Sequence, residues 1–304
     1  MNQYAAGIVI YNPDLIRLKE NIDAVSPQVK TVYCFDNGSK GQSALKDMLK
    51  HYDNVVLMAE KNNLGIATAL NRIIDRAHKD QMEWLLTLDQ DSVVCNRMIE
   101  KLAALTGEEK TLIICPIIED VRRKNEKPVV TSNTFESVDF CITSGSFMNV
   151  EKTIVIGGFD EFLFIGLVDN DICMRANYEG YRIIRNNAVV LNHELGNLTP
   201  TKFEKFYLKL GDVLHNETIK KLSYKREVNS LRLYYATRNM FYLKKKYAQF
   251  DNENVWYKMI VKNSFSSIIR GGYRLNIIKA VLLGIRDGRA VCAEPYVLMH
   301  TKIK

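Results

Sequence analysis

The chain has 304 residues, of which 47% are hydrophobic and 25% are charged, a composition typical of a soluble globular protein with a sizeable core. No stretch approaches the roughly 20 apolar residues of a membrane span, so we expect no segment that crosses a bilayer. The net charge of +7 conceals a division, because residues 1–200 carry −6 and residues 201–304 carry +13. A basic region of this kind contacts nucleic acid, an anionic membrane or only solvent, and composition alone ranks solvent first.

Cysteine usage points to a reducing compartment. The six cysteines are scattered, form no Cys-x-x-Cys pair and mostly lie in apolar strand-like runs: Cys34, Cys95, Cys115, Cys141, Cys173 and Cys292. Such placement favours buried, reduced thiols. The N-terminus shows no basic leader, and the apolar run at residues 5–10 is shorter than a signal h-region. We therefore expect a cytoplasmic protein.

The first 200 residues alternate strand-like and helix-like segments. Short apolar runs typical of strands occupy residues 4–11, 31–35, 54–59, 83–88 and 111–115. Between them, apolar residues at helical spacing predict amphipathic helices, notably from Leu15 to Val25 and over residues 64–77. This alternation predicts an α/β fold with a mostly parallel sheet, whose ligand crevice lies outside the carboxyl ends of the strands.

The segment Asp89-Gln90-Asp91-Ser92 directly follows the apolar run at residues 84–88, so two carboxylates emerge where a buried strand reaches the surface. Carboxylate oxygens suit Mg²⁺ or Mn²⁺ carrying a diphosphate. The alternative is a turn or a helix cap without a metal.

A second polar segment, Asp36-Asn37-Gly38-Ser39, follows the run at residues 31–35. It forms either a simple turn, or a site where Asp36 meets a nucleobase N–H while Gly38 lets the chain pass closely. After the first strand stands Tyr11-Asn12-Pro13-Asp14 instead of Gly-x-Gly-x-x-Gly, and the chain has no Walker A loop. The missing glycine motif argues against a dinucleotide-dependent dehydrogenase, and any nucleotide binding would use a scheme other than these two motifs.

Taken in order and spacing, these segments resemble the donor half of inverting family 2 glycosyltransferases, which have a GT-A fold: Tyr11-Asn12-Pro13, Asp36 to Ser39, Asn63-Leu64-Gly65-Ile66-Ala67 with Asn71, and Leu88 to Ser92. Later segments are similar to the acceptor half of that family: Ser144 to Phe147, Gly157 to Glu161, Leu163-Phe164-Ile165, Val168 to Asp171, Arg175 and Gly180-Tyr181. Asp-Gln-Asp-Ser, Leu-Phe-Ile followed by Val-Asp, and His193-Glu194-Leu195-Gly196 most resemble bacterial rhamnosyltransferases. The resemblance covers residues 4–240.

The resemblance implies a GT-A-like catalytic domain over residues 1–200, followed by a basic, helical region over residues 201–304. It implies nucleotide-sugar contacts from Tyr11, Asp36, Asn37, Asn63, Gly65, Asn71, Asp89 and Arg238. It further implies metal ligands at Asp91 and His193, acceptor contacts from Ser144, Gly145, Asp160 and Asp171, and a catalytic base at Asp169. The first member of the usual acidic pair is Val168 here, as in the rhamnosyl branch, whereas Gly166 stands where that branch often has aspartate.

Three of these residues have simpler interpretations. Asp169 precedes a helix-like segment at residues 171–178 and would cap it. His193 follows a strand-like run at residues 188–191, where a lone histidine is often a hydrogen-bonded structural residue. Arg238 would lie on the surface of an amphipathic helix, although a guanidinium also suits a pyrophosphate.

The chemistry implied is a single displacement. A Mg²⁺ or Mn²⁺ cofactor would stabilise the diphosphate leaving group while one carboxylate deprotonates an acceptor hydroxyl, which inverts the anomeric centre. The resemblance favours dTDP-L-rhamnose as donor and a lipid-linked glycan of bacterial surface polysaccharide as acceptor. The alternatives are a hexosyltransferase using UDP-galactose or UDP-glucose, and a nucleic-acid-binding module, for which the chain has no recognised motif.

The basic C-terminal region predicts docking at the cytoplasmic face of an anionic membrane, without crossing it. Within residues 274–286, Leu275, Ile278, Leu282 and Ile285 form a helical apolar stripe with basic neighbours. Alternatively, the stripe packs onto the catalytic domain or onto a second subunit of a homo-oligomer.

Overall fold

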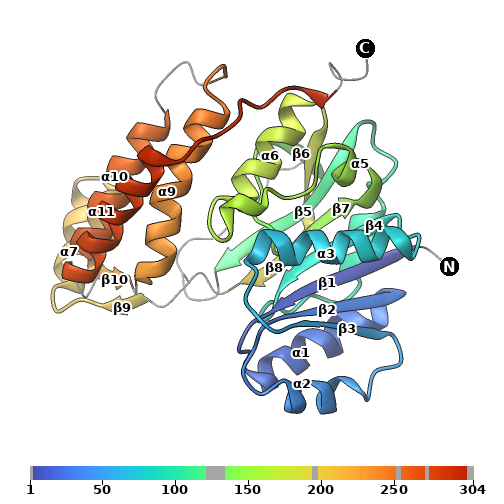
Figure 1. Ribbon diagram of the computed structural model, residues 1–304. Coiled ribbons are helices and arrows are strands. Elements are labelled where there is room, and N and C mark those ends of the chain that lie inside the picture. Colours follow the sequence, from blue (N-terminus) through green and yellow to red (C-terminus); the bar gives the residue numbers. More distant parts are fainter. Residues whose placement is uncertain are drawn as a thin grey trace. The chain divides into compact units, whose positions relative to one another are not determined.

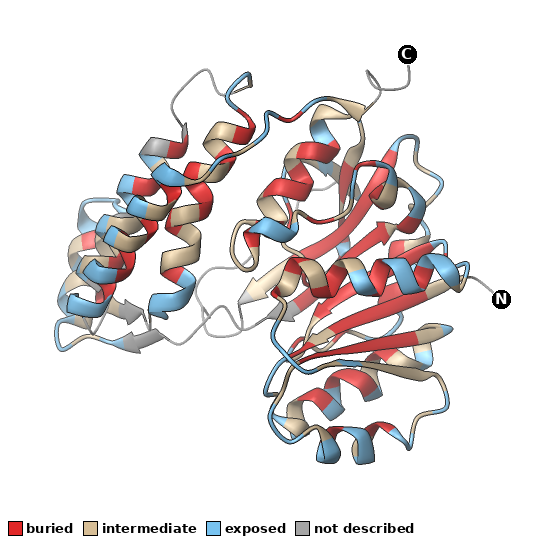
Figure 2. Cartoon of the chain, viewed as in Figure 1, coloured by how far each residue is buried: buried red, intermediate tan, exposed pale blue. Residues whose placement is uncertain are grey.

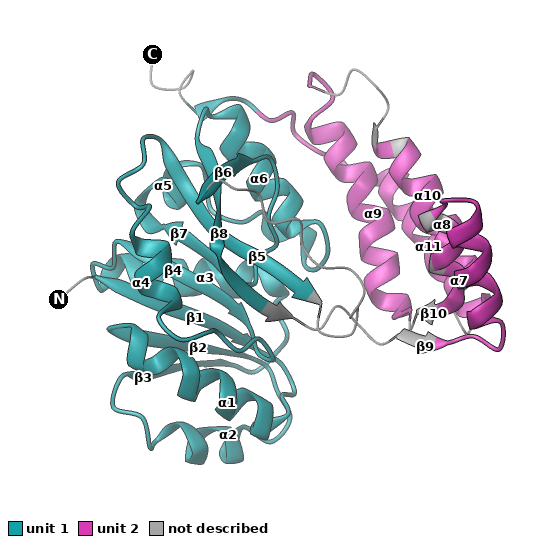
Figure 3. Ribbon diagram, turned by 180° about the vertical axis from the view of Figure 1, so that it is seen from behind, with its two compact units in different colours: residues 1–194, 297–304 teal, residues 195–296 magenta. Residues whose placement is uncertain are grey.

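The computed structural model describes residues 3–120, 134–193, 198–226, 228–250, 255–270 and 274–299. The chain forms two compact units (Figure 3), one of residues 1–194 with 297–304 and one of residues 195–296. The first contains a large sheet with helices, and the second is mainly helical.

The sheet of the first unit has eight strands in the order β3-β2-β1-β4-β7-β5-β8-β6 (Figure 1). Four neighbouring pairs are parallel, and the three pairs β4–β7, β5–β7 and β6–β8 are antiparallel. The predicted α/β class with a mostly parallel sheet is therefore confirmed. The strands are β1 (Tyr4–Ile10), β2 (Thr31–Asn37), β3 (Val55–Glu60), β4 (Trp84–Asp89), β5 (Thr111–Asp120), β6 (Phe135–Val138), β7 (Ser146–Asn149) and β8 (Arg182–His193).

Helices cover both faces of this sheet, as β–α alternation requires. They are α1 (Leu15–Val25), α2 (Gln42–Leu49), α3 (Ile66–Lys79), α4 (Met98–Ala103), α5 (Val150–Val155) and α6 (Val168–Tyr178), with short 3₁₀ helices at η1 (Ser26–Gln28) and η2 (Glu161–Leu163). Helices α1, α2 and α4 share one core cluster with alternate residues of β1, namely Ala6, Ile8 and Ile10. Helix α3 lies on the other face, where Gly7 leaves room for Ile73.

Local sequence explains where α1 begins and which face of α3 is buried. The side chain of Asp14 accepts hydrogen bonds from the backbone N–H groups of Ile16 and Arg17 and so caps α1. The buried face of α3 repeats through Ala67, Leu70, Ile74 and Ala77, as predicted, although the helix begins at Ile66 and not at residue 64. Burial is concentrated in the strands and the inward helix faces (Figure 2).

Four of the six cysteines are buried, and all six are free thiols, in agreement with the sequence prediction. Cys95 is half-buried and Cys292 is exposed.

The second unit consists of a two-stranded antiparallel sheet, β9 (Leu198–Pro200) with β10 (Tyr224–Arg226), and five helices among its described residues. The helices are α7 (Glu204–Val213), α8 (Glu217–Lys220), α9 (Ser230–Lys246), α10 (Val255–Arg270) and α11 (Arg274–Ala290), with η3 at Lys221–Ser223. None of the helices that the structure describes is long and apolar enough to cross a membrane.

Helix α11 packs on α9 through a face of small residues. A Cβ at Gly284 would lie 2.7 Å from Cβ of Thr237, and one at Gly288 would lie 2.8 Å from Cβ of Phe241. Most of the predicted apolar stripe lies on a different face, because Leu275 and Leu282 are 84% and 60% exposed. Ile285, the last residue of the stripe, packs against the cluster that includes Leu233 of α9, so only the exposed part of the stripe lies outside the contact with α9.

Candidate active site

The carboxyl ends of three neighbouring parallel strands, β2, β1 and β4, meet at one edge of the sheet. From β1 the chain proceeds to β2 and β3 and then returns to β4 on the other side of β1. Such a reversal of strand order opens a crevice at the carboxyl ends, where α/β proteins bind ligands. The two polar segments singled out in the sequence begin at this edge, at Asp36 in β2 and Asp89 in β4.

The turn after β2 holds an unsatisfied buried carboxylate oxygen. Oδ1 of Asp36 accepts a hydrogen bond from the backbone N–H of Ser39 at 3.0 Å, as the simple-turn interpretation predicts. Oδ2 of Asp36 is buried and has no hydrogen-bond partner. Because a buried acceptor without a donor costs free energy, this oxygen suits a ligand N–H such as that of a nucleobase.

Asn37 holds the neighbouring loop with its entire amide. Its Nδ2 donates to Oδ1 of Asn63 and to the carbonyl of Gly65, each at 3.1 Å, and its Oδ1 accepts from the N–H of Leu64 at 2.8 Å. Gly38 has φ of +83°, and a Cβ there would lie 2.6 Å from the carbonyl carbon of Asn62. Asn37 therefore shapes the wall of the crevice.

The turn after β4 is fixed through its backbone. The N–H of Asp89 donates to Oγ of Ser144 at 3.1 Å, and the carbonyl of Asp91 accepts from Nε of Arg17 at 3.0 Å. Gln90 accepts from the N–H of Tyr11 at 2.8 Å, which joins the ends of β1 and β4. The turn thus presents two aspartates at the crevice, with Asp91 exposed and Asp89 half-buried.

These two aspartates fit part of a divalent-cation site. No group of three or more His, Cys, Asp or Glu among the described residues could hold a metal ion. Mg²⁺ nevertheless binds commonly through one or two carboxylates together with substrate phosphates and water. His193 ends β8, and its side chain lies outside the described residues.

Asp169 is the second residue of α6, not its cap. The N-cap position is occupied by Leu167 at φ of +62°, and Oδ1 of Asp169 accepts from the N–H of Asn170 at 3.1 Å. The interpretation of Asp169 as a helix cap is therefore wrong.

The surroundings of Asp169 perturb its acidity. Apolar side chains, including Ile113, Phe159 and Ile172, pack closely around it. The pKa of Asp169 is raised to about 6, chiefly by burial; backbone N–H groups partly offset the rise, and nearby Cys141 and Asp89 add to it. A carboxyl group with a pKa close to neutral is suited to general base chemistry.

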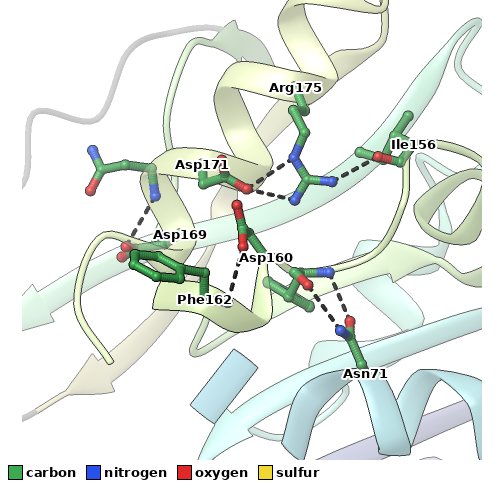
Figure 4. Close-up of polar contacts among 9 residues, drawn as sticks. Asn71, Ile156, Asp160, Phe162, Asp169, Asp171 and Arg175 are labelled. Carbon is green, nitrogen blue, oxygen red and sulfur yellow. Dashed lines mark hydrogen bonds and ion pairs between the residues drawn. The ribbon is translucent and has the colours of Figure 1, made fainter. Parts of the chain in front are cut away.

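Two residues farther along α6, Asp171 forms a buried ion pair with Arg175 (Figure 4). Nε and Nη2 of Arg175 donate to Oδ2 of Asp171 at 2.9 and 2.7 Å, and Nη1 donates to the carbonyl of Ile156 at 2.7 Å. This network anchors α6 to the end of α5.

The other residues predicted on the acceptor side also make structural contacts. Oδ1 of Asp160 accepts from the N–H of Phe162 at 3.0 Å and caps η2 (Figure 4). Oγ of Ser144 lies 2.8 Å from Oγ of Ser92 in addition to its bond with Asp89. Gly145 has φ of +90° and donates its N–H to the carbonyl of Thr87 at 2.7 Å.

Two residues predicted to bind donor have surroundings that the sequence did not indicate. The amide of Asn71 binds the segment that leads to η2 rather than the turns after β2 and β4. Arg238 lies on α9 of the second unit, where its Nε and Nη2 donate to Oδ1 of Asn239 at 3.0 and 2.7 Å and its guanidinium lies 4.7 Å from the ring centre of Tyr235.

Three residues that support the site were not predicted. Gln90 lies between the two aspartates, and this position in the tetrapeptide was a local signal of its role in supporting the site. Arg17 and Asn21 lie one helical turn apart on α1 and bind the carbonyls of Asp91 and Asp89. Their partners are about 70 residues away, and no local pattern indicates such a pairing.

Comparison with known proteins agrees with this geometry. The model of the family described as "Glycosyl transferase family 2" matches residues 6–162, about half of the chain. The chain belongs to this family. A curated relative, the "dTDP-rhamnosyl transferase RfbF" of Shigella flexneri, is 27% identical over 265 residues, which cover 81% of this chain and 80% of the relative.

Two solved glycosyltransferase structures share the fold. GalNAc-T7 with UDP, GalNAc and Mn²⁺ has a TM-score of 0.54 at 15% identity, over 63% of this chain and 43% of that one. S. aureus TarS has a TM-score of 0.53 at 15% identity, over 92% of this chain and 49% of that one. The present chain thus spans less than half the length of either solved chain. Its expected GT-A fold is confirmed.

Proposed function

We propose that this family 2 glycosyltransferase transfers L-rhamnose from dTDP-L-rhamnose to a hydroxyl group of a lipid-linked glycan, with inversion at the anomeric carbon. The observation that carries the catalytic part is the carboxyl group of Asp169, whose pKa is raised to about 6 and which lies near enough to Asp89 to respond to its charge. The similarity to RfbF over four fifths of the chain supports the choice of rhamnose.

The chain supplies distinct groups to the donor. Oδ2 of Asp36 is the acceptor for a nucleobase N–H, since it is buried and has no partner in the protein. The loop that Asn37 holds, including Asn63, forms the wall beside the nucleoside.

Asp91, with Asp89 and His193 as further candidates, would hold a Mg²⁺ or Mn²⁺, which when bound stabilises the negative charge of the diphosphate. Asp169 accepts the proton of the acceptor hydroxyl while the hydroxyl oxygen bonds to the anomeric carbon and the bond from that carbon to the diphosphate breaks. One displacement inverts the configuration, so a β-L-rhamnosyl donor gives an α-linked product.

A panel of sugar nucleotides tests the donor assignment. The purified protein is heated with dTDP-L-rhamnose, UDP-galactose or UDP-glucose, each with Mg²⁺, Mn²⁺ or EDTA, because a ligand that binds the native state raises the melting temperature. We expect the largest shift with dTDP-L-rhamnose and metal, followed by release of dTDP. Stabilisation by a UDP-hexose alone would instead identify a hexosyltransferase.

We expect Asp91→Ala to weaken metal-dependent donor binding by roughly 10–100-fold, because it removes an anionic ligand of the cation. Isothermal titration of the donor with and without Mn²⁺ measures the effect. Asp53→Ala is the matched control, since Asp53 is exposed just before β3, at the opposite edge of the sheet. Unchanged metal-dependent affinity in Asp91→Ala would refute the assignment.

The second unit has a surface suited to an anionic membrane. Of 17 large apolar side chains exposed among the described residues, 11 lie within residues 195–296, including Phe206 on α7, Phe265 on α10 and Leu275 on α11. Its described residues also expose ten Lys or Arg but only two acidic side chains, Asp212 and Glu294. We propose that these helices dock the enzyme at the cytoplasmic face of the inner membrane, next to its lipid-linked acceptor.

Co-sedimentation with vesicles tests the docking. Binding to vesicles that contain phosphatidylglycerol should fall with added salt, and Lys258→Glu with Lys262→Glu should weaken it at least about tenfold, since each basic residue near the surface contributes about 1 kcal/mol. Phe265→Gln should weaken it as well, whereas Ile16→Gln, at an exposed position of the first unit, should not. Absence of binding at low salt, with a dimer in light scattering, would favour a homo-oligomer instead.

A further inference from the structure

The segment that leads to Asp169 is anchored to α3 by the side chain of Asn71. Oδ1 of Asn71 accepts from the N–H of Phe159 at 2.7 Å, and Nδ2 donates to the carbonyl of the same residue at 2.9 Å (Figure 4). Nδ2 also donates to Oε1 of Glu161 at 2.9 Å. A single amide thus replaces the backbone partner that Phe159 would have in a sheet.

A second anchor lies one turn earlier on the same helix. The N–H of Ile66, in the first turn of α3, donates to the carbonyl of Phe164 at 2.6 Å. The first N–H groups of a helix have no partner within the helix, so an outside carbonyl satisfies one of them here. Gly65 permits this approach, because a Cβ there would lie 2.6 Å from the ring of Phe164. Helix α3 therefore holds residues 159–164 at both ends.

The backbone that follows requires such support. Phe164 and Leu167 have φ of +58° and +62°, values that are unfavourable for residues other than glycine. Such a backbone conformation is strained and persists only where the surrounding structure holds it. Helix α6 begins at the next residue, Val168, and Asp169 follows. The position of Asp169 thus depends on a strained segment that α3 restrains.

We propose that Asn71 is a positioning residue for transfer: it ties the segment before Asp169 to the helix that follows the donor loop, and so places the base relative to the bound donor. This inference rests on the proposed function, because it takes Asp169 as the base. The resemblance implied donor contact for Asn71, whereas its amide is engaged by residues 159–161. A displacement of about 1 Å at a reacting group can cost a hundredfold in rate.

The chemistry of the amide makes the test specific. Asn71→Leu has a similar shape and removes all three hydrogen bonds. Asn71→Asp retains an acceptor for the N–H of Phe159, but places carboxylate oxygens against the Phe159 carbonyl and Glu161. Glu161→Gln keeps an acceptor for Nδ2 of Asn71 and leaves both hydrogen bonds between Asn71 and Phe159 in place. Asp75→Asn is the matched control, since Asp75 is exposed one turn along α3.

Three measurements are made on each full-length variant: donor affinity by isothermal titration, turnover of the donor, and amide hydrogen exchange. We expect both Asn71 variants to lose turnover about 10–100-fold with donor affinity within about twofold of wild type. Exchange should accelerate in residues 157–169 and remain unchanged in β1 to β4. Glu161→Gln and Asp75→Asn should stay within about threefold of wild-type turnover.

Wild-type turnover in Asn71→Leu would overturn the proposal. So would a parallel loss of donor affinity with faster exchange throughout the first unit, because that pattern indicates general destabilisation. If the wild-type protein binds no nucleotide sugar, the proposed function itself is wrong and the role of Asn71 in transfer falls with it. Failure of the positioning role alone is recognised by normal donor binding and normal turnover in the variants.

Discussion

Asp169→Asn is expected to lower the rate of sugar transfer by about 10²–10⁴-fold, the usual effect of removing a general base. The change preserves the shape of the side chain and its acceptor oxygen toward Asn170, while it removes the group that takes the acceptor proton. Donor affinity should remain close to wild type. Initial rates and isothermal titration on the purified variant measure the two effects separately.

The pH dependence provides an independent check of this assignment. A base acts when deprotonated, and burial raises the pKa of Asp169 to about 6, so the wild-type rate should fall as the pH drops through about 6. The residual activity of Asp169→Asn should lack this acidic limb. Asp139→Asn, at an exposed position ahead of β7, should keep both the rate and the limb. Near-wild-type turnover by folded Asp169→Asn would eliminate Asp169 as the base.

Arg175→Leu is expected to lower the free energy of unfolding by about 3–5 kcal/mol. The substitution leaves the carboxylate of Asp171 buried without its cation and leaves the carbonyl of Ile156 without Nη1. An uncompensated buried charge costs far more than the pair contributes in net stability. Urea unfolding followed by circular dichroism measures the loss.

Two further variants identify the buried pair as the cause. Asp171→Leu combined with Arg175→Leu should be less destabilised than Arg175→Leu alone, because no charge then remains buried. Arg76→Leu removes an Arg–Asp pair of the same spacing, with Asp80, that lies near the surface of α3. It should cost about 1 kcal/mol or less. Equal losses in Arg76→Leu and Arg175→Leu would show that burial is not the origin of the effect.

Several elements near the active site could be predicted because their signals are local. The apolar runs that became β1 to β4 are bounded by polar turns, and the apolar residues of α1 and α3 recur at helical spacing. Strands β6 and β7 were not predicted, because four residues are too few for a periodic signal. Strand β7 lies between β4 and β5, an antiparallel insertion that depends on pairing over more than 50 residues of sequence.

Residue types at strand ends allowed the sequence to predict which side chains gather at the crevice. Asp36 and Asp89 lie at neighbouring carboxyl ends because parallel strands bring their ends to one edge. The partners of other predicted site residues could not be predicted in the same way. Asn71 binds Phe159 across 88 residues, and Asp171 is paired in the interior rather than directed to a ligand.

The sequence by itself determined the fold class, the edge of the sheet that carries the site and the family resemblance, since each depends on order and spacing along the chain. Only the tertiary structure decided which carboxylates are engaged and which are available for chemistry. Asp169 and Asp171 are two residues apart on one helix, yet the first is half-buried with a raised pKa and the second is neutralised by Arg175. The charge partner of Asp171 is only four residues away, but the burial of Asp169 comes from residues distant in sequence, such as Ile113 and Phe159.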